Sequence, residues 1–107
     1  MPWRVETLNE TVAQEIEALP LDMQARLIRL GERIAQVGLE RLRQPEVKHL
    51  KDKLWEMRLT GRDGIARALY VTVVGQRVVI VRVFVKKTRK TPKAEIDLAL
   101  CRAKEVR

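Results

Sequence analysis

The sequence predicts an α+β fold: an N-terminal helical hairpin packs on a small, twisted, mainly antiparallel sheet, and a C-terminal helix follows. Two observations predict this class. Apolar residues recur every three or four positions over residues 7–38, and every second position from residue 54 onward. The 107 residues contain no internal repeat, linker or low-complexity tract, so we expect one domain spanning residues 1–107. Apolar residues make up 46% and aromatic residues 4%, which predicts an aliphatic core.

The first residues predict a strand and a short helix. Apolar and polar side chains alternate over residues 3–6, as in a half-buried strand. Thr7 and Glu10 then have the spacing of a capping box, and an apolar residue recurs every three or four positions after them. This pattern predicts a helix that ends at Leu19, because the residue before Pro20 disfavours helical backbone.

A second helix is predicted over residues 21–37, antiparallel to the first. Its apolar stripe is continuous, Asp22 is the expected N-cap, and Gly38 is expected just beyond the last turn. Two helices joined by a short turn could also form a DNA-reading helix-turn-helix. Residues 1–47 hold six Lys/Arg against eight Asp/Glu, however, and phosphate would repel an acidic recognition helix.

From "LWEMRL" onward the pattern predicts strands. Trp55, Met57 and Leu59 share the more apolar face, which we expect against the helices. Glu56 and Arg58 are then left on the open face of the sheet.

The runs "IARALYVTVV" and "RVVIVRVFV" predict a hairpin with Gly75 and Gln76 as its two-residue loop. Counting back from that loop pairs Leu69 with Arg82. One face of the hairpin then carries Arg67, Leu69, Arg82, Phe84 and Lys86. The other face carries Ala66, Ala68, Tyr70, Val81, Val83 and Val85, and it is the better core surface. We therefore expect three cations to converge on one open sheet face.

The last helix is predicted to begin at Thr91-Pro92, as N-cap and first helical residue. Its apolar stripe contains Ala94, Leu98 and Cys101, so the single cysteine is expected to be a small core residue. One cysteine cannot form an internal disulfide, which fits a reducing cytoplasm, and no run of apolar residues is long enough for a membrane span.

Charge distribution points to a polyanionic partner. Residues 48–107 hold sixteen Lys/Arg against six Asp/Glu, a net charge of +10, whereas the whole chain carries +8. Nucleic acid is the usual partner of such a surface. The alternative is a basic protein with no such partner.

The chemistry open to these residues needs no metal and no cofactor. One His and one Cys with scattered carboxylates match no metal-ligand spacing, and there is no Gly-rich phosphate loop. RNA cleavage can proceed without a metal because the substrate 2′-hydroxyl is the nucleophile, and Lys and Arg can stabilise charge on the phosphate. Each of these residues could instead have a purely structural role: Arg58 could pair with Glu56, His49 could be an exposed loop residue, and Phe84 could belong to the core.

Two segments, "KHLKDKLWEMRLTGRDGIARALY" and "FVKKTRKTPKAEIDLALCRAKE", resemble the HigB-like, phage-derived branch of the RelE/ParE toxin superfamily. The matching positions are Lys48, Leu50, Leu54, Trp55, Glu56, Arg58, Arg67, Phe84, Lys86, Lys87, Thr91, Pro92 and Glu95. The resemblance implies a RelE-like fold and the toxin of a type II toxin–antitoxin pair. Such a toxin cleaves mRNA in the ribosomal A site and is silenced by a cognate helix-turn-helix antitoxin.

Carried over by motif, the resemblance implies phosphate-binding roles for Arg58 and Arg67, and a transition-state or leaving-group cation at Lys86 or Lys87. Around these four catalytic candidates we predict an RNA-binding surface of Lys48, His49, Lys51, Lys53, Arg82, Phe84, Arg89 and Lys90.

The motif "TPKAEI" departs from some nuclease branches, which place a Tyr or His there as general base. The base is therefore unassigned among Lys86, Lys87, Glu56 and His49. Two rivals stay open: a ParE-like inhibitor of DNA gyrase and a nonenzymatic basic nucleic-acid-binding module.

Overall fold

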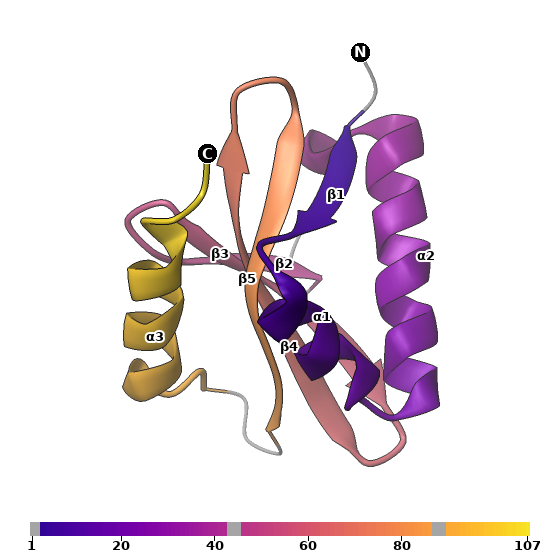
Figure 1. The fold of residues 1–107 in the computed structure, drawn as a ribbon. Helices are drawn as coiled ribbons and strands as arrows, with labels where there is room; N and C mark the ends of the chain where they lie inside the picture. The colour runs from indigo at the N-terminus through magenta and orange to yellow at the C-terminus, as the bar shows by residue number, and fades with distance from the viewer. Residues whose placement is uncertain (1–2, 43–45, 87–89) are drawn as a thin grey trace.

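A computed structural model describes residues 3–42, 46–86 and 90–107 and confirms the α+β class (Figure 1). The elements, in chain order, are β1 (Arg4–Thr7), α1 (Glu10–Glu17), α2 (Leu21–Val37), the 3₁₀ turn η1 (Leu39–Arg41), β2 (Val47–Lys51), β3 (Leu54–Gly61), β4 (Gly64–Val73), β5 (Arg77–Lys86) and α3 (Lys93–Ala103). Five strands form one sheet in the order β1-β5-β4-β3-β2. All neighbours are antiparallel except β1 and β5, which run parallel.

The sheet separates α1 and α2 from α3, which stands on the opposite side (Figure 1). The larger core joins the two N-terminal helices to one sheet face through aliphatic side chains and Tyr70. The smaller core packs α3 on the other face, around Leu54, Leu69, Phe84 and Ala99. The sheet is therefore buried on both sides, and the open face predicted from the sequence does not exist as such.

Helix ends differ from the prediction where a side chain finds a better partner. Asn9, not Thr7, caps α1, because its Oδ1 accepts a hydrogen bond from the N–H of Val12 at 3.1 Å. Asp22 lies inside the first turn of α2, and its Oδ2 accepts from the N–H of Arg62 at 2.8 Å. That bond ties the start of α2 to the turn between β3 and β4.

Two irregularities in the β4–β5 hairpin offset each other. The pairing begins with Val73 opposite Arg77, so the loop has three residues and not the predicted two. A bulge follows, since Leu69 pairs with Arg82 whereas Tyr70 pairs with Ile80. Beyond the bulge the register is the predicted one.

The bulge also changes which face its extra residue takes. Val81 was expected with the larger core, and it lies in the smaller one, under α3.

The stripe predicted for α3 is wrong. Ala94, Leu98 and Cys101 all lie at the surface, while Ala99 is buried, with Ile96 and Leu100 packed beside it. The helix begins after Pro92, and the hydroxyl of Thr91 does not cap it. The prediction fails because a stripe chosen from one helical face cannot show which face meets the sheet.

Strand β2 was not predicted, and the alternative that His49 lies in a loop is wrong, because His49 is part of this strand. It pairs with β3 and forms the sheet edge opposite β1, with a register shift after His49. This strand places Lys48 directly opposite Glu56. Within the three described segments no helix is both long and apolar enough to cross a membrane.

Candidate functional site: a cationic cleft over a buried carboxylate

Glu56 is the centre of a polar cluster on the α3 side of the sheet. Its side chain is 0% exposed. One carboxylate oxygen, Oε2, accepts a hydrogen bond from Nε of Arg58 at 2.8 Å. The other, Oε1, accepts from the hydroxyl of Thr91 and lies 3.7 Å from Nε of Arg67, whose side chain is also 0% exposed.

Strand geometry explains how these residues meet. Glu56 and Arg58 are two positions apart on β3 and so share a face, and Arg58 is paired across the sheet with Arg67 on β4. Thr91 reaches the same place from the segment that leads into α3. Its hydroxyl donates a hydrogen bond to Glu56, and the N-cap position of α3 is Pro92.

Burial controls the electrostatics of this cluster. Removal from water lowers the pKa of the Arg67 guanidinium, the Glu56 carboxylate opposes that change, and the nearby charge of Arg58 adds to it. An arginine keeps its proton in proteins even so. The cluster therefore buries a carboxylate beside one guanidinium and holds a second at its border, since the Arg58 side chain is 19% exposed.

A cleft of about 600 Å³ opens above the cluster. Its walls come from β2, β3 and the start of α3, and they are lined by Lys48, His49, Leu50, Arg58, Lys90, Thr91 and Ile96. Four of these are among the predicted site residues: Lys48, His49, Arg58 and Lys90. The structure thus gathers four of the predicted residues around one hollow, although they come from three separate segments.

His49 lies at the edge of this cleft and is exposed. Its Nε2 is 2.7 Å from the carbonyl oxygen of Asp52. Its ring packs edge-to-face with that of Trp55, with 5.1 Å between the ring centroids. Because a carbonyl oxygen only accepts hydrogen bonds, Nε2 carries the proton in this contact. The other ring nitrogen is then the basic one.

The sequence predicted that Arg67 lies on an open sheet face, and this is wrong because its side chain is buried. Packing of α3 against β3, β4 and β5 closes that face over it. In this arrangement Arg67 supports the cleft from beneath and does not line it.

Arg82 and Phe84 belong to the interior and not to a binding surface. Arg82 donates to Glu95 at 2.7 Å and to Glu15 at 2.8 Å, and its guanidinium stacks 5.6 Å from the centre of the Phe84 ring. Phe84 itself is 9% exposed and packs in the smaller core. Glu15 helps to hold Arg82 in the interior, because it joins α1 to β5 and to Arg102 of α3. Nothing in the sequence had singled out Glu15.

Three further predicted cations within the described residues do not line the cleft. Lys51 and Lys86 are exposed outside its lining, and Lys53 borders a separate hollow near the C-terminal end of α3. Lys87 and Arg89 lie outside the described residues.

Sequence reasoning missed the role of Thr91. It read the Thr-Pro pair as a helix start, and no spacing rule shows that the hydroxyl would reach a strand 35 residues away. Leu50 and Ile96, the apolar part of the cleft lining, were missed as well.

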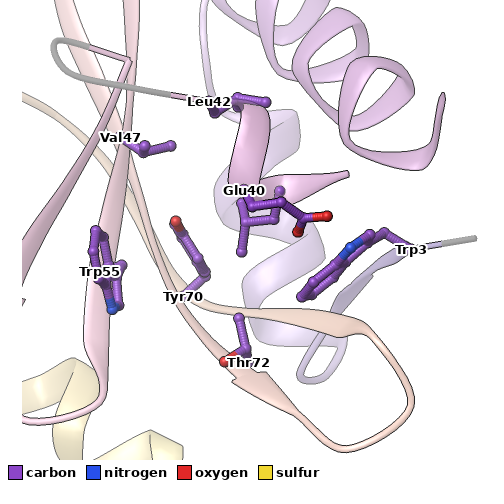
Figure 2. Close-up of a pocket in the computed structure, with 8 residues that line it drawn as sticks. Trp3, Glu40, Leu42, Val47, Trp55, Tyr70 and Thr72 are labelled. Carbon is purple, nitrogen blue, oxygen red and sulfur yellow. The ribbon is translucent and has the colours of Figure 1, made fainter. Parts of the chain in front are cut away.

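A second hollow, of about 400 Å³, lies on the other face of the sheet beside η1 (Figure 2). Trp3, Leu42, Trp55 and Tyr70 give it an apolar lining, and burial raises the pKa of Tyr70. None of the predicted cations in the described part of the chain lines it. In the described ranges, no three His, Cys, Asp or Glu side chains gather as metal ligands would.

Comparison with known proteins agrees with this fold. Residues 14–104 match the family described as phage derived protein Gp49-like (DUF891). The crystal structure of the archaeal RelE-RelB complex from Pyrococcus horikoshii OT3 is similar, with a TM-score of 0.59 and 18% identity over 84% of this chain and 100% of that chain. No curated protein matches.

These findings confirm the predicted RelE-like α+β fold and the resemblance to the RelE superfamily; the HigB-like branch stays a prediction. Since the family match extends from α1 to the end of α3 and includes every residue that lines the cationic cleft, this chain belongs to the phage-derived Gp49-like family.

Proposed function

We propose that this protein is the toxin of a type II toxin–antitoxin pair, and that it cleaves mRNA in the ribosomal A site. One observation carries the nuclease proposal: Lys48, His49, Arg58 and Lys90 line a single cleft. The family and the fold support the toxin proposal. A RelE protein has been crystallised with RelB, and by analogy this chain would bind a cognate antitoxin, for which the sequence resemblance predicts a helix-turn-helix protein. Its place of action would be the cytoplasm, where ribosomes work.

The cleft suits a bent RNA strand better than a rigid duplex. Its cations come from both walls, and the apolar side chains of Leu50 and Ile96, which also line it, give a base a surface to contact. Arg58 offers a planar fork for the oxygens of one phosphate, while Lys48 and Lys90 supply point charges for its neighbours.

The reaction would balance without a metal. The 2′-oxygen attacks the adjacent phosphorus and the bond from phosphorus to the 5′-oxygen breaks, leaving a 2′,3′-cyclic phosphate and a 5′-hydroxyl. A base takes the proton of the 2′-hydroxyl and an acid returns one to the 5′-oxygen. Arg58 would stabilise the charge that builds on the phosphate oxygens.

His49 is our candidate for moving protons, because it lines the cleft and its second ring nitrogen faces away from the Asp52 carbonyl. Lys86 stays a candidate cation for the leaving group, and Arg67 is proposed to act from below through its positive charge. Glu56 is a poor base in this geometry, since it is fully buried and already accepts hydrogen bonds at both oxygens.

The test is cleavage of a translated message by purified protein, with wild type compared to Arg58→Gln. Losing one preorganised donor typically costs about 10²- to 10³-fold in rate, and we expect a loss of that size. Arg26→Gln is the matched control: it removes the same charge from an exposed position on α2, away from the cleft.

Primer extension should find cuts on the translated message and none on the same message without a start codon. The new 5′ ends should be hydroxyls, which accept phosphate from a kinase before ligation. Growth arrest without cuts would move the target to gyrase or another protein. Binding without cuts or growth arrest would make the chain a nucleic-acid-binding module.

A further inference from the structure

Glu56 holds both walls of the cationic cleft through separate oxygens. Oε2 accepts from Arg58, which lines the cleft from β3. Oε1 accepts from Thr91, which lines the cleft from the start of α3 and directly follows Lys90. Arg67 lies beneath, 3.7 Å from the same Oε1. A single carboxylate therefore bonds to both walls, to Arg58 on β3 and to Thr91, the residue after Lys90.

We propose that Glu56 is the positioning residue of this cleft: it orients the Arg58 guanidinium toward one RNA phosphate and anchors Thr91, so that Lys90 faces a neighbouring phosphate of the same strand. This inference rests on the proposed function. Glu56 does not line the cleft and touches no substrate in this role; it acts through Arg58 and Thr91.

Stability alone does not account for a carboxylate at this position. Taking a charge pair out of water is costly, and apolar residues of similar size often serve the fold equally well. The surroundings are suited to such a replacement, because Leu54, Leu69 and Phe84 form the adjacent core. What an apolar side chain could not do is accept two directed hydrogen bonds, one from each wall.

The chemistry of glutamine makes the proposal testable. Glu56→Gln keeps the shape of the side chain but exchanges one acceptor oxygen for an NH₂ donor. Nε of Arg58 can only donate, so it must bond to the amide oxygen, and the hydroxyl of Thr91 must turn to accept from the NH₂. Both bonds then lose the carboxylate charge and become weaker. Thr91→Val is the second variant, which releases the α3 wall and leaves the bond from Arg58 to Glu56 intact.

The control is Glu95→Gln. Glu95 is also a carboxylate bonded to an arginine, Arg82 at 2.7 Å, and it lies on α3 just beyond the cleft. Like Glu56→Gln, the substitution Glu95→Gln removes a negative charge that joins the α3 segment to the sheet. A general loosening of α3 would therefore affect Glu95→Gln as well, whereas loss of positioning would not.

Cleavage kinetics on programmed ribosomes should separate the variants. Outer contacts that orient functional groups in metal sites are typically worth about 10- to 100-fold, and we expect Glu56→Gln to lower the maximal rate by that factor and Thr91→Val by about 10-fold. The ribosome concentration at half-maximal rate should change little, because Glu56 does not itself line the cleft. Glu95→Gln should cleave as fast as wild type.

Combined substitutions test whether Glu56 acts through its two neighbours. In an Arg58→Gln, Thr91→Val background, Glu56→Gln should add less than about twofold, because both groups through which it acts have already been changed. A full, multiplicative loss in that background would overturn the proposal, and so would wild-type cleavage by Glu56→Gln.

Arginine side-chain NMR gives a readout that does not depend on cleavage. The Nε–H of Arg58 should exchange slowly with water in the wild type and in Glu95→Gln, and rapidly in Glu56→Gln. Equal exchange in all three proteins would refute the orienting contact.

Failure of the proposed function would be recognised separately, as absence of cleavage by the wild type. The positioning role would then be decided by binding of a labelled single-stranded RNA. Weaker binding by Glu56→Gln but not by Glu95→Gln would support it, and equal binding by all three proteins would refute it.

Discussion

Arg67→Ala is expected to destabilise the fold strongly, because it leaves a buried carboxylate with one fewer counter-charge. Nε of Arg67 lies 3.7 Å from Oε1 of Glu56, and both side chains are 0% exposed. At that separation, an effective dielectric constant of 20 gives an attraction of about 4 kcal/mol. Breaking a buried pair by removing one partner usually costs about 3–5 kcal/mol. Since Arg58 stays 2.8 Å from Glu56, we expect the lower end, about 3 kcal/mol.

Urea unfolding followed by circular dichroism measures this loss. The unfolding midpoint should fall while the slope of free energy against urea stays constant, since the surface exposed on unfolding hardly changes. Lys93→Ala is the control: its ion pair with Asp97 is exposed on α3 and should be worth less than about 0.5 kcal/mol. If Arg67→Ala lies within about 1 kcal/mol of wild type, water reaches Glu56 and the reasoning about burial is wrong.

The same magnitude decides how a functional test should be designed. A domain of this size has a free energy of unfolding of about 5–15 kcal/mol, so a loss of about 3 kcal/mol can lower its amount in cells. Abolished growth arrest in Arg67→Ala would then not separate catalysis from folding. Arg58→Gln is the better variant, because Arg58 borders the cleft and is partly exposed.

Two pH-dependent predictions follow from buried or paired side chains. Burial raises the pKa of Tyr70, so the stability that its protonated hydroxyl confers is complete below the usual tyrosine value of 10.0 and is lost as pH rises beyond it. Tyr70→Phe should therefore unfold at higher pH than wild type in an alkaline titration, and an unchanged midpoint would contradict this. Hydrogen bonds from Arg77 lower the pKa of Glu6, so its contribution is present above 4.5 and is lost as pH falls through the lowered value. Glu6→Gln should be less stable than wild type at pH 7 and equal to it in strong acid, measured by urea unfolding at both pH values; a difference that persists in acid would rule out this pair as its cause.

Local patterns predicted the fold class and most of its elements. Helical spacing marked α1 and α2, and alternation marked β3, β4 and β5, because in each case the apolar stripe faces a core that the chain must bury. The short strand β2 was missed, since "VKHLK" is mostly polar and becomes a strand only by pairing with β3.

Side-chain faces were predicted well only where pairing and pattern agreed. Alternation correctly put Glu56 and Arg58 on the face opposite Met57 and Leu59. The bulge at Val81 could not be foreseen, because an extra residue in one strand leaves no mark on its apolar run. The extra residue of the bulge is offset by the extra residue of the loop, so the pairs predicted beyond the bulge are correct although neither irregularity was predicted.

By itself, the sequence determined the α+β class, the concentration of positive charge in the second half of the chain, and the resemblance of its motifs to RelE-type toxins. These are properties of composition and of local period, which the chain carries before it folds. Only the tertiary structure decided which cations meet: α3 closes over Arg67, Glu15 and Glu95 neutralise Arg82, and β2 brings Lys48 to the cleft. The physical reason is that a cation's availability depends on which carboxylates and which surfaces lie against it, and those come from segments far away in the chain.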